Sequence, residues 1–232
     1  MDLWGRIYLD YWRGELHPHV LERDDGKSHT IPSAAGYFIP PQGLGENAAL
    51  ATLSGRVLDL GCGAGRYTRV LETRGVAVTA IDSSPGAIEV CRERGCRDAR
   101  VADIDDLPAD LGRFTSIICM GNTLGIGQDP DRLPERLRRL RTSLEPGGCL
   151  LAAIRDPLST EDPDHLRYHA RNRTQGRPAG LTRARLRYRG EVGAWWELWM
   201  PTEPELELAA GDAEWSVRCI DVEGSNRLYQ LT

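Results

Sequence analysis

Residues 57–65 read VLDLGCGAG, an apolar run that ends in three glycines at every second position. The run over 56–60 has the length and side chains of a buried strand, and helical spacing of apolar residues follows over 67–71. Glycines in such a turn let the backbone bend tightly, so that its N–H groups come close to a ligand. The stretch therefore predicts a strand, a ligand-binding loop and a helix at the start of an α/β domain.

Short apolar runs and helical segments continue to alternate downstream of this loop. Strands are predicted over 76–81, 100–102, 114–120 and 149–154, and helices over 86–94 and 131–144. This alternation is typical of βαβ units, in which helices connect the strands of a parallel sheet. The carboxyl ends of those strands share one edge, where such sheets bind their ligands.

The spacing of the loop differs from that of a dinucleotide-binding loop. Gly65 comes one residue early, and Arg66 stands where dinucleotide-binding domains need a small residue. Asp59 would repel a pyrophosphate, but it can accept hydrogen bonds from an amino acid moiety. Asp82 follows about 20 residues after the loop, where doubly wound folds hold ribose hydroxyls. The pattern favours a nucleoside ligand over a nicotinamide dinucleotide.

Five segments in order resemble the motifs of the class I S-adenosylmethionine-dependent methyltransferase family. They lie at 57–65, 80–85, 102–104, 114–123 and 144–150, so that the resemblance covers residues 55–156. It implies an α/β fold with a Rossmann-like, seven-stranded, mostly parallel sheet that ends in a C-terminal antiparallel hairpin. It also implies that the chain is a methyltransferase enzyme whose cofactor is S-adenosylmethionine.

The same motifs assign the cofactor-binding residues. In the family, the glycine loop contacts the methionine part of the cofactor, and the acid after the second strand holds both ribose hydroxyls. An aspartate after the third strand meets the adenine amino group, and the end of the fourth strand lies beside the methyl group. The predicted cofactor-binding residues are Asp59, Gly61, Cys62, Gly63, Gly65, Asp82, Ser83, Asp103, Ile104 and Met120.

The segments on either side of the motifs predict the remaining organisation. Residues 1–50 are interpreted as an irregular, aromatic-rich N-terminal cover segment, and 51–232 as the methyltransferase domain. Within it, 157–202 is predicted to be a β-rich insertion after strand five, on the substrate side. Its first part, 157–180, is expected to be a loop, followed by a hairpin of 183–189 with 194–200. A helix over 204–210 and a hairpin of 215–222 with 227–231 complete the prediction.

Residues that contact the acceptor are less well defined by the sequence. Methyl transfer depends mainly on orientation and exclusion of water, so the pattern does not assign a catalytic residue outright. His165 and His169 have the spacing of two ligands on one helix face, but the glutamate of a zinc protease motif is missing, and no metal is predicted. The catalytic candidates are Asn122, Arg155, Tyr11 and His165. The substrate-binding candidates are Tyr8, Arg23, Tyr37, Arg155 and His169.

The expected reaction is O- or N-methylation of a small-molecule acceptor. Because a fold does not fix its reaction, an elimination or cyclisation in the same pocket is the alternative. A non-catalytic binding subunit is disfavoured by the intact glycine loop, and a nicotinamide dehydrogenase by its spacing.

The composition and charge of the chain also indicate which classes of binding partner to expect. The net charge of -5 disfavours a nucleic-acid partner, which would need a basic surface. The sequence has no apolar run close to the roughly 20 residues that cross a bilayer, so no membrane partner is expected. The N-terminus does not resemble a signal peptide and the cysteines lack a disulfide framework, which predicts a cytoplasmic protein. The oligomeric state is left open, with a homodimer as one option.

Overall fold

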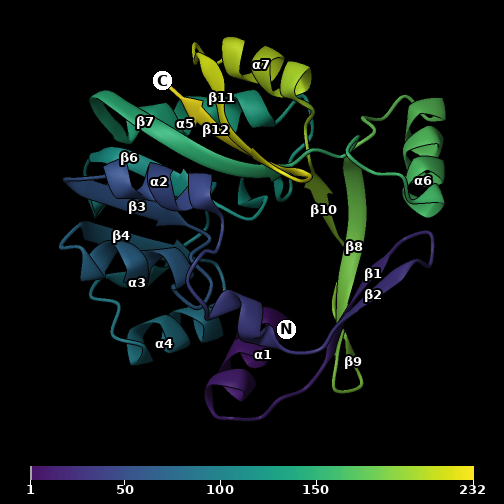
Figure 1. Ribbon diagram of the computed structural model, residues 1–232, viewed down its shortest axis with the longest axis horizontal. Helices are drawn as coiled ribbons and strands as arrows, with labels where there is room; N and C mark the ends of the chain where they lie inside the picture. The colour runs from purple at the N-terminus through teal and green to yellow at the C-terminus, as the bar shows by residue number, and fades with distance from the viewer. Residues whose placement is uncertain (1) are drawn as a thin grey trace.

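The large sheet follows the predicted order of strands. The computed structural model describes residues 2–232 and contains a seven-stranded sheet in the order β11-β12-β7-β6-β3-β4-β5 (Figure 1). The strands are β3 (Arg56–Leu60), β4 (Ala77–Asp82), β5 (Ala99–Val101), β6 (Phe114–Cys119), β7 (Leu144–Arg155), β11 (Val217–Glu223) and β12 (Asn226–Leu231). β3 to β7 pair in parallel, whereas β12 is antiparallel to both β7 and β11. The predicted α/β fold and its C-terminal hairpin are confirmed.

Helices cover both faces of this sheet because successive residues of its strands point to opposite sides. The helices are α2 (Leu44–Thr52), α3 (Arg66–Thr73), α4 (Pro85–Glu93), α5 (Leu133–Thr142) and α7 (Glu203–Gly211). Leu58 packs with α5 and α7, whereas its neighbour Val57 packs with α2 and α3. Within residues 2–232 we find no helix with the length and apolarity needed to span a bilayer.

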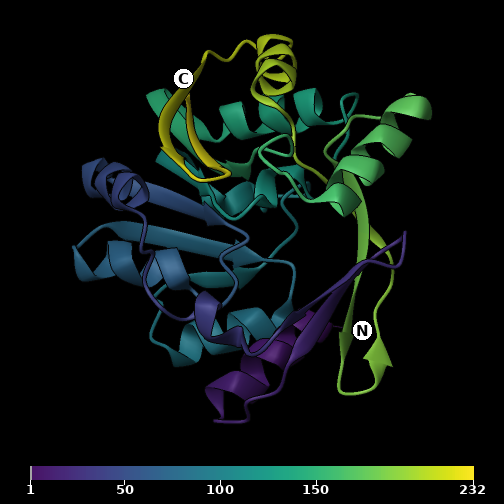
Figure 2. The same cartoon turned by 45° about the vertical axis from the view of Figure 1, so that its right-hand side comes forward.

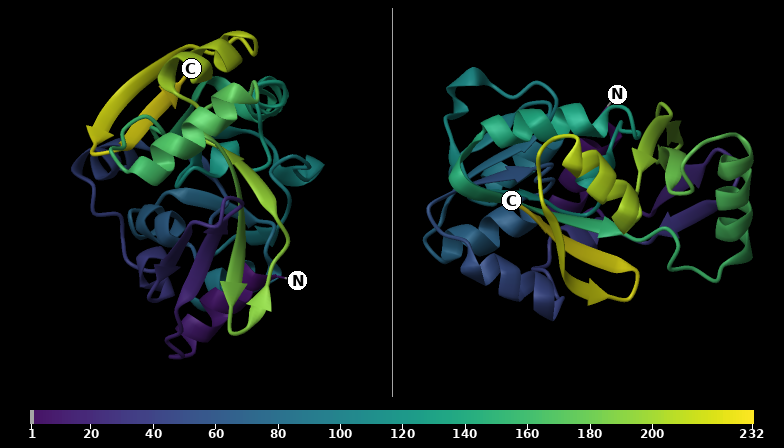
Figure 3. Two further views of the ribbon diagram at one scale, coloured as in Figure 1. Left: turned by 90° about the vertical axis from the view of Figure 1, so that its right-hand side faces the viewer. Right: turned by 90° about the horizontal axis from the view of Figure 1, so that it is seen from above.

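A second, antiparallel sheet has the order β10-β8-β1-β2, with β9 paired to β8. It stands beside the large sheet, as the views from the side and from above show (Figure 3). Its strands are β1 (His19–Arg23), β2 (Ser28–Ile31), β8 (Leu181–Tyr188), β9 (Glu191–Val192) and β10 (Trp196–Trp199). The predicted hairpin in the insertion is present as β8 and β10. Its other neighbour is β1, so the N-terminal segment and the insertion form one sheet.

Two of the predictions for the flanking segments are wrong. Residues 1–50 are not irregular: they form α1 (Leu3–Trp12), β1, β2, the short 3-10 helix η1 (Ala34–Tyr37) and α2. Residues 157–180 are not a loop, since α6 (Pro163–Thr174) begins after the capping carboxylate of Asp162. The strand β1 has no local partner other than β2 and depends on β8, far along the chain. Because this pairing joins segments that are far apart in the chain, the local pattern of apolar residues does not predict it.

The N-terminal helix is fixed beside the glycine loop by a close helix crossing. A Cβ atom on Gly5 would lie 2.7 Å from the Cα atom of Gly86, so α1 meets α4 where neither has a side chain. The carboxylate of Asp2 accepts from the N–H of Gly5 at 2.8 Å, from the Ser84 hydroxyl at 2.8 Å and from the N–H of Gly86 at 3.0 Å. One carboxylate therefore caps two helices.

We expect Asp2→Ala to lower the free energy of unfolding by about 1–2 kcal/mol, because donors at the start of both α1 and α4 lose their acceptor. Urea unfolding followed by circular dichroism measures the change. Asp131→Ala removes the same charge from an exposed position and is the matched control. Equal stabilities of the two variants would contradict the double cap.

Candidate active site

A cavity of about 860 Å³ is lined by residues of the carboxyl edge of the large sheet and by residues of the N-terminal segment and the insertion. Figure 2 shows the small sheet beside the large one. The volume of the cavity lies in the range of about 300–1,000 Å³ that is usual for small-molecule sites. The large sheet contributes Gly61, Cys62, Gly63, Asp82, Ser83, Asp103, Ile104, Met120, Gly121 and Thr123. The N-terminal segment contributes Asp2, Trp4, Tyr8 and Tyr37, and the insertion contributes Leu186, Gly193, Ala194, Trp195, Trp196 and Leu198.

Asp82 is held in place by the backbone of the loops around it. One carboxylate oxygen accepts from the N–H of Gly63 and the other from the N–H of Ser84, both at 2.9 Å. Burial raises the pKa of Asp82, and these two hydrogen bonds oppose the rise. Because a carboxylate oxygen has two lone pairs, each oxygen can still accept from a ligand hydroxyl. The second strand thus presents a preoriented acceptor at the cavity.

Asp59 does not line the cavity, in contrast to its predicted role. It is buried at the end of β3, where its carboxylate accepts from the Thr68 hydroxyl at 2.6 Å and from the Thr68 backbone. Thr68 belongs to the first turn of α3, so this carboxylate acts as a cap for that helix. Burial raises the pKa of Asp59 to about 7. Its contribution to the site is to fasten the helix behind the glycine loop.

Gly65 also lies outside the cavity lining. Its φ of +78° is left-handed, and a Cβ atom there would come within 2.7 Å of the Cys96 Sγ and 2.8 Å of the Cys91 Sγ. The glycine is therefore required for packing of the loop against α4. The other eight residues predicted to bind the cofactor all line the cavity, where their predicted role stays a prediction.

One wall of the cavity is aromatic. Tyr8 and Tyr37, both predicted to bind substrate, have ring centroids 5.2 Å apart, and that of Trp4 lies 5.8 Å from Tyr8 and 5.5 Å from Tyr37. Trp195 and Trp196 extend this wall from the insertion. The sequence predictions omitted Trp4. The sequence feature that could have identified Trp4 is its helical spacing from Tyr8, which puts both rings on one face of α1.

None of the four catalytic candidates lines the cavity. The side-chain oxygen of Asn122 accepts from the N–H of Arg155 at 2.6 Å and joins the ends of β6 and β7, while Arg155 is exposed. Tyr11 packs against Phe38, with centroids 4.5 Å apart. His165 lies on α6, 3.3 Å from the Thr160 hydroxyl. Their predicted catalytic roles are not supported by their positions.

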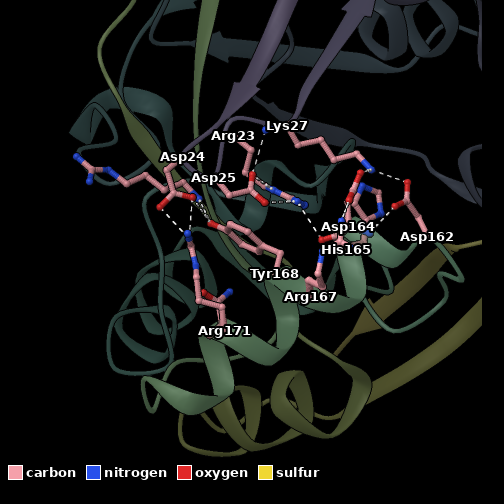
Figure 4. A network of polar contacts seen from close by, with 12 residues as sticks. Arg23, Asp24, Asp25, Lys27, Asp162, Asp164, His165, Arg167, Tyr168 and Arg171 are labelled. Atoms are coloured by element: carbon pink, nitrogen blue, oxygen red, sulfur yellow. Dashed lines mark hydrogen bonds and ion pairs between the residues drawn. The ribbon is translucent and has the colours of Figure 1, made fainter.

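Arg23 and His169 also lie away from the cavity. Arg23 binds Asp25 with two nitrogens, at 2.8 and 2.6 Å, and stacks 4.0 Å over the ring of Tyr168. Asp24 accepts from the Tyr168 hydroxyl at 2.8 Å and from Arg171 at 2.9 Å (Figure 4). This ionic network joins the β1–β2 hairpin to α6, the helix on which His169 is buried. Neither Arg23 nor His169 lines the cavity, and their role in substrate binding stays a prediction.

Two arginines in the cavity wall were not predicted to bind ligands. Arg136 is 2% exposed, and its guanidinium donates to Asp105 at 2.9 and 2.5 Å and to the carbonyl of Leu124 at 2.8 Å. It therefore holds two loops at the cavity edge. Arg66 begins α3 and is half-buried. Its Nε is shielded from water, and its guanidinium makes no hydrogen bond or ion pair within residues 2–232.

Comparison with known proteins agrees with this geometry. Residues 57–148 match the methyltransferase domain family model. The chain is 36% identical over 110 residues to a ubiquinone biosynthesis O-methyltransferase of Xanthomonas oryzae pv. oryzae, which is 45% of this chain and 44% of that protein. A protein of the same name from Xylella fastidiosa is 39% identical over 157 residues, 65% of this chain and 62% of that one. The chain thus spans about half the length of the first curated relatives that it matches.

A solved structure covers the whole chain. It is the S-adenosylmethionine-dependent methyltransferase of Bacteroides fragilis in complex with S-adenosyl-L-homocysteine, with a TM-score of 0.85 and 27% identity over 100% of this chain and 94% of that one. The fold is therefore the Rossmann-like fold of an S-adenosylmethionine-dependent methyltransferase, and residues 57–148 are similar to the methyltransferase domain family.

Proposed function

We propose that this protein transfers the methyl group of S-adenosylmethionine to an oxygen or nitrogen atom of a small molecule. The observation that carries the proposal is the Asp82 carboxylate, fixed by the backbone of Gly63 at the wall of a nucleoside-sized cavity. The Bacteroides fragilis protein, described in complex with the cofactor product, supports the same ligand here.

The residues present fit an adenosyl sulfonium. Asp82 has free lone pairs for two ribose hydroxyls, and Asp103 and Ile104 lie next in the wall, where the adenine is proposed to bind. The Nε of Arg66, buried without an acceptor, matches a ligand with an anionic group. When bound, the cofactor supplies a methyl carbon made electrophilic by the sulfonium. The chain's own task is to orient the acceptor and exclude water.

The aromatic wall is proposed to hold the acceptor. Trp4, Tyr8 and Tyr37 approach from the N-terminal segment, while Trp195 and Trp196 approach from the insertion. Flat rings of this kind bury a planar or apolar ligand at little entropic cost. Residues 1–50 and 157–202 then act together as the acceptor-side cover of the domain, because their strands share one sheet.

One observation favours an elimination or cyclisation as a second candidate function. Tyr11 and His165, the two predicted catalytic residues that could act as a base, lie outside the cavity, so neither is placed to activate an acceptor. In that reaction the cavity would bind the same cofactor and leave its methyl group in place.

The test is incubation with S-adenosylmethionine carrying a labelled methyl group and a panel of phenols, carboxylates and amines. We expect release of S-adenosylhomocysteine with the label in the acceptor. Label that stays on the cofactor product after turnover would favour the second candidate. Calorimetry that detects binding of neither S-adenosylmethionine nor S-adenosylhomocysteine would refute both.

A further inference from the structure

Charged side chains are distributed unevenly around the cavity. Most of them come from the carboxyl edge of the large sheet, where the cofactor is proposed to bind: Arg66, Asp82, Asp103, Asp105 and Arg136. We call the residues of 1–50 and 157–202 that line the cavity the cover wall; they include Trp4, Tyr8, Tyr37, Trp195 and Trp196. Among the described residues of the cover wall, Asp2 is the charged one, and its carboxylate already accepts from the N–H groups of Gly5 and Gly86. The cover wall therefore offers a ligand no free ionic partner.

The ionisable side chains in and next to the cover wall are held in their neutral forms. His19 is 0% exposed, and its ring centroid lies 5.9 Å from that of Trp4 and 6.5 Å from that of Tyr37. Within residues 2–232 neither of its ring nitrogens has a hydrogen-bond partner, and burial lowers the pKa of His19. Burial raises the pKa of Tyr37, and burial, with smaller contributions from Tyr37 and Asp82, raises the pKa of Tyr8. One environment thus disfavours a cation at His19 and an anion at both tyrosines.

Two arginines stack on the cover wall without lining the cavity. The guanidinium carbons of Arg185 and Arg183 lie 4.4 and 5.5 Å from the ring centroid of Trp195. Arg185 donates to both carboxylate oxygens of Glu22 at 3.0 Å, and Arg183 is exposed to water. A ligand in the cavity therefore contacts the uncharged indole of Trp195 and not these guanidinium groups.

Such a wall discriminates between ligands by their charge. A carboxylate or an ammonium group that leaves water for the cover wall loses its hydration and gains no counter-ion. The carboxylate also meets the negative faces of the aromatic rings, whereas cation–π attraction returns to the ammonium only part of what desolvation costs. An uncharged aromatic ring is buried and stacked without this cost, and indole N–H and phenol O–H groups can still bind its oxygen or nitrogen atoms.

We propose that the acceptor is an uncharged, planar aromatic molecule, and that molecules with an ammonium or carboxylate group on the part enclosed by the cover wall are excluded. The inference rests on the proposed function and narrows it. Of the phenols, carboxylates and amines in the panel, it selects the phenols and those aromatic amines that are uncharged in water.

Three naphthalene derivatives of similar shape test this selection. At pH 7, 2-naphthol is uncharged, 2-naphthoate is an anion and 2-naphthylmethylammonium is a cation. S-adenosylhomocysteine is present at saturation, so that the probe has only the acceptor side to occupy. We expect 2-naphthol to bind at least about tenfold more tightly than either ion in calorimetry. Equal or tighter binding of either ion, or no binding of 2-naphthol, would overturn the inference.

A cation placed in the cover wall should shift this preference. Ala194 is exposed, lines the cavity and lies outside the helices and strands, so that Ala194→Lys adds a charge there without burying it. We expect the affinity for 2-naphthoate relative to 2-naphthol to rise about three- to tenfold.

Two controls belong to this variant. Ala194→Gln lengthens the same side chain without a charge, and Val192→Lys adds the same charge two residues away, outside the cavity lining. Both should keep the affinity ratio of the unmodified protein. An unchanged ratio in Ala194→Lys, or the same rise in Val192→Lys, would show that the charge of the cover wall does not select the ligand.

The outcomes separate the inference from the proposed function. If the unmodified protein does not bind S-adenosylhomocysteine, the proposed function is wrong. If it binds S-adenosylhomocysteine and then binds the naphthalene ions as tightly as 2-naphthol, the function stands and the assignment of an uncharged acceptor is overturned.

Discussion

Replacing Asp82 by alanine is expected to weaken S-adenosylhomocysteine binding by about 2–4 kcal/mol, roughly 30- to 1,000-fold. Two losses add up. The ribose hydroxyls lose a charged acceptor, and the N–H groups of Gly63 and Ser84, which now donate to the carboxylate at 2.9 Å, lose their partner. The second loss loosens the glycine loop itself. Isothermal calorimetry at fixed ionic strength measures the change.

Two further variants make this prediction specific. Asp82→Asn keeps the shape and one accepting oxygen, so its loss of affinity should lie between that of alanine and none. Asp106→Ala removes an exposed carboxylate from the turn after β5, outside the cavity lining, and should bind the ligand normally. Unchanged affinity of Asp82→Ala, in a variant that melts like the parent, would show that the nucleoside lies elsewhere.

The central sheet was predictable because its determinants are local. Runs such as 76–81 and 114–120 are mostly apolar, as expected of strands buried on both faces, and turns with glycine or proline separate them from helices. The small sheet was not predictable in the same way. β1 alternates charged and apolar residues weakly and is half-buried, and it owes its strand structure to pairing with β8. No sequence pattern within β1 itself predicts that contact.

The same distinction divides the candidate site. Gly61, Gly63 and Asp82 are tied to the ends of strands, so that their predicted place followed from the fold. Polar residues on the flanks carried no such constraint. Arg23 was a plausible substrate ligand until its partner Asp25 and the ring of Tyr168 were seen beside it. Ionic residues in a sequence do not reveal whether their charge is already paired.

Asp59 makes the free energy of unfolding decrease as the pH rises, which is the opposite of the effect of most carboxylates. Burial raises its pKa from an ordinary 3.8 to about 7, against the hydrogen bonds from Thr68. The folded state therefore binds this proton more tightly than the unfolded chain does. The resulting stability is fully present below about pH 4 and is lost as the pH rises through about 7. A shift of about three pKa units corresponds to at most roughly 4 kcal/mol.

We expect Asp59→Asn to remove this dependence, because the amide stays neutral and its oxygen still accepts from Thr68. The stability of the variant minus that of the parent should rise by about 2–4 kcal/mol from pH 4 to pH 8, measured by urea unfolding. Asp98→Asn serves as the control. Hydrogen bonding to Arg100 lowers the pKa of Asp98 from its ordinary 3.8, so the stability that this carboxylate contributes is lost only below about pH 4, and the effect of Asp98→Asn should stay constant from pH 4 to pH 8. A stability difference for Asp59→Asn that is flat across this range would show that Asp59 ionises normally, with its charge solvated or compensated at the base of the glycine loop.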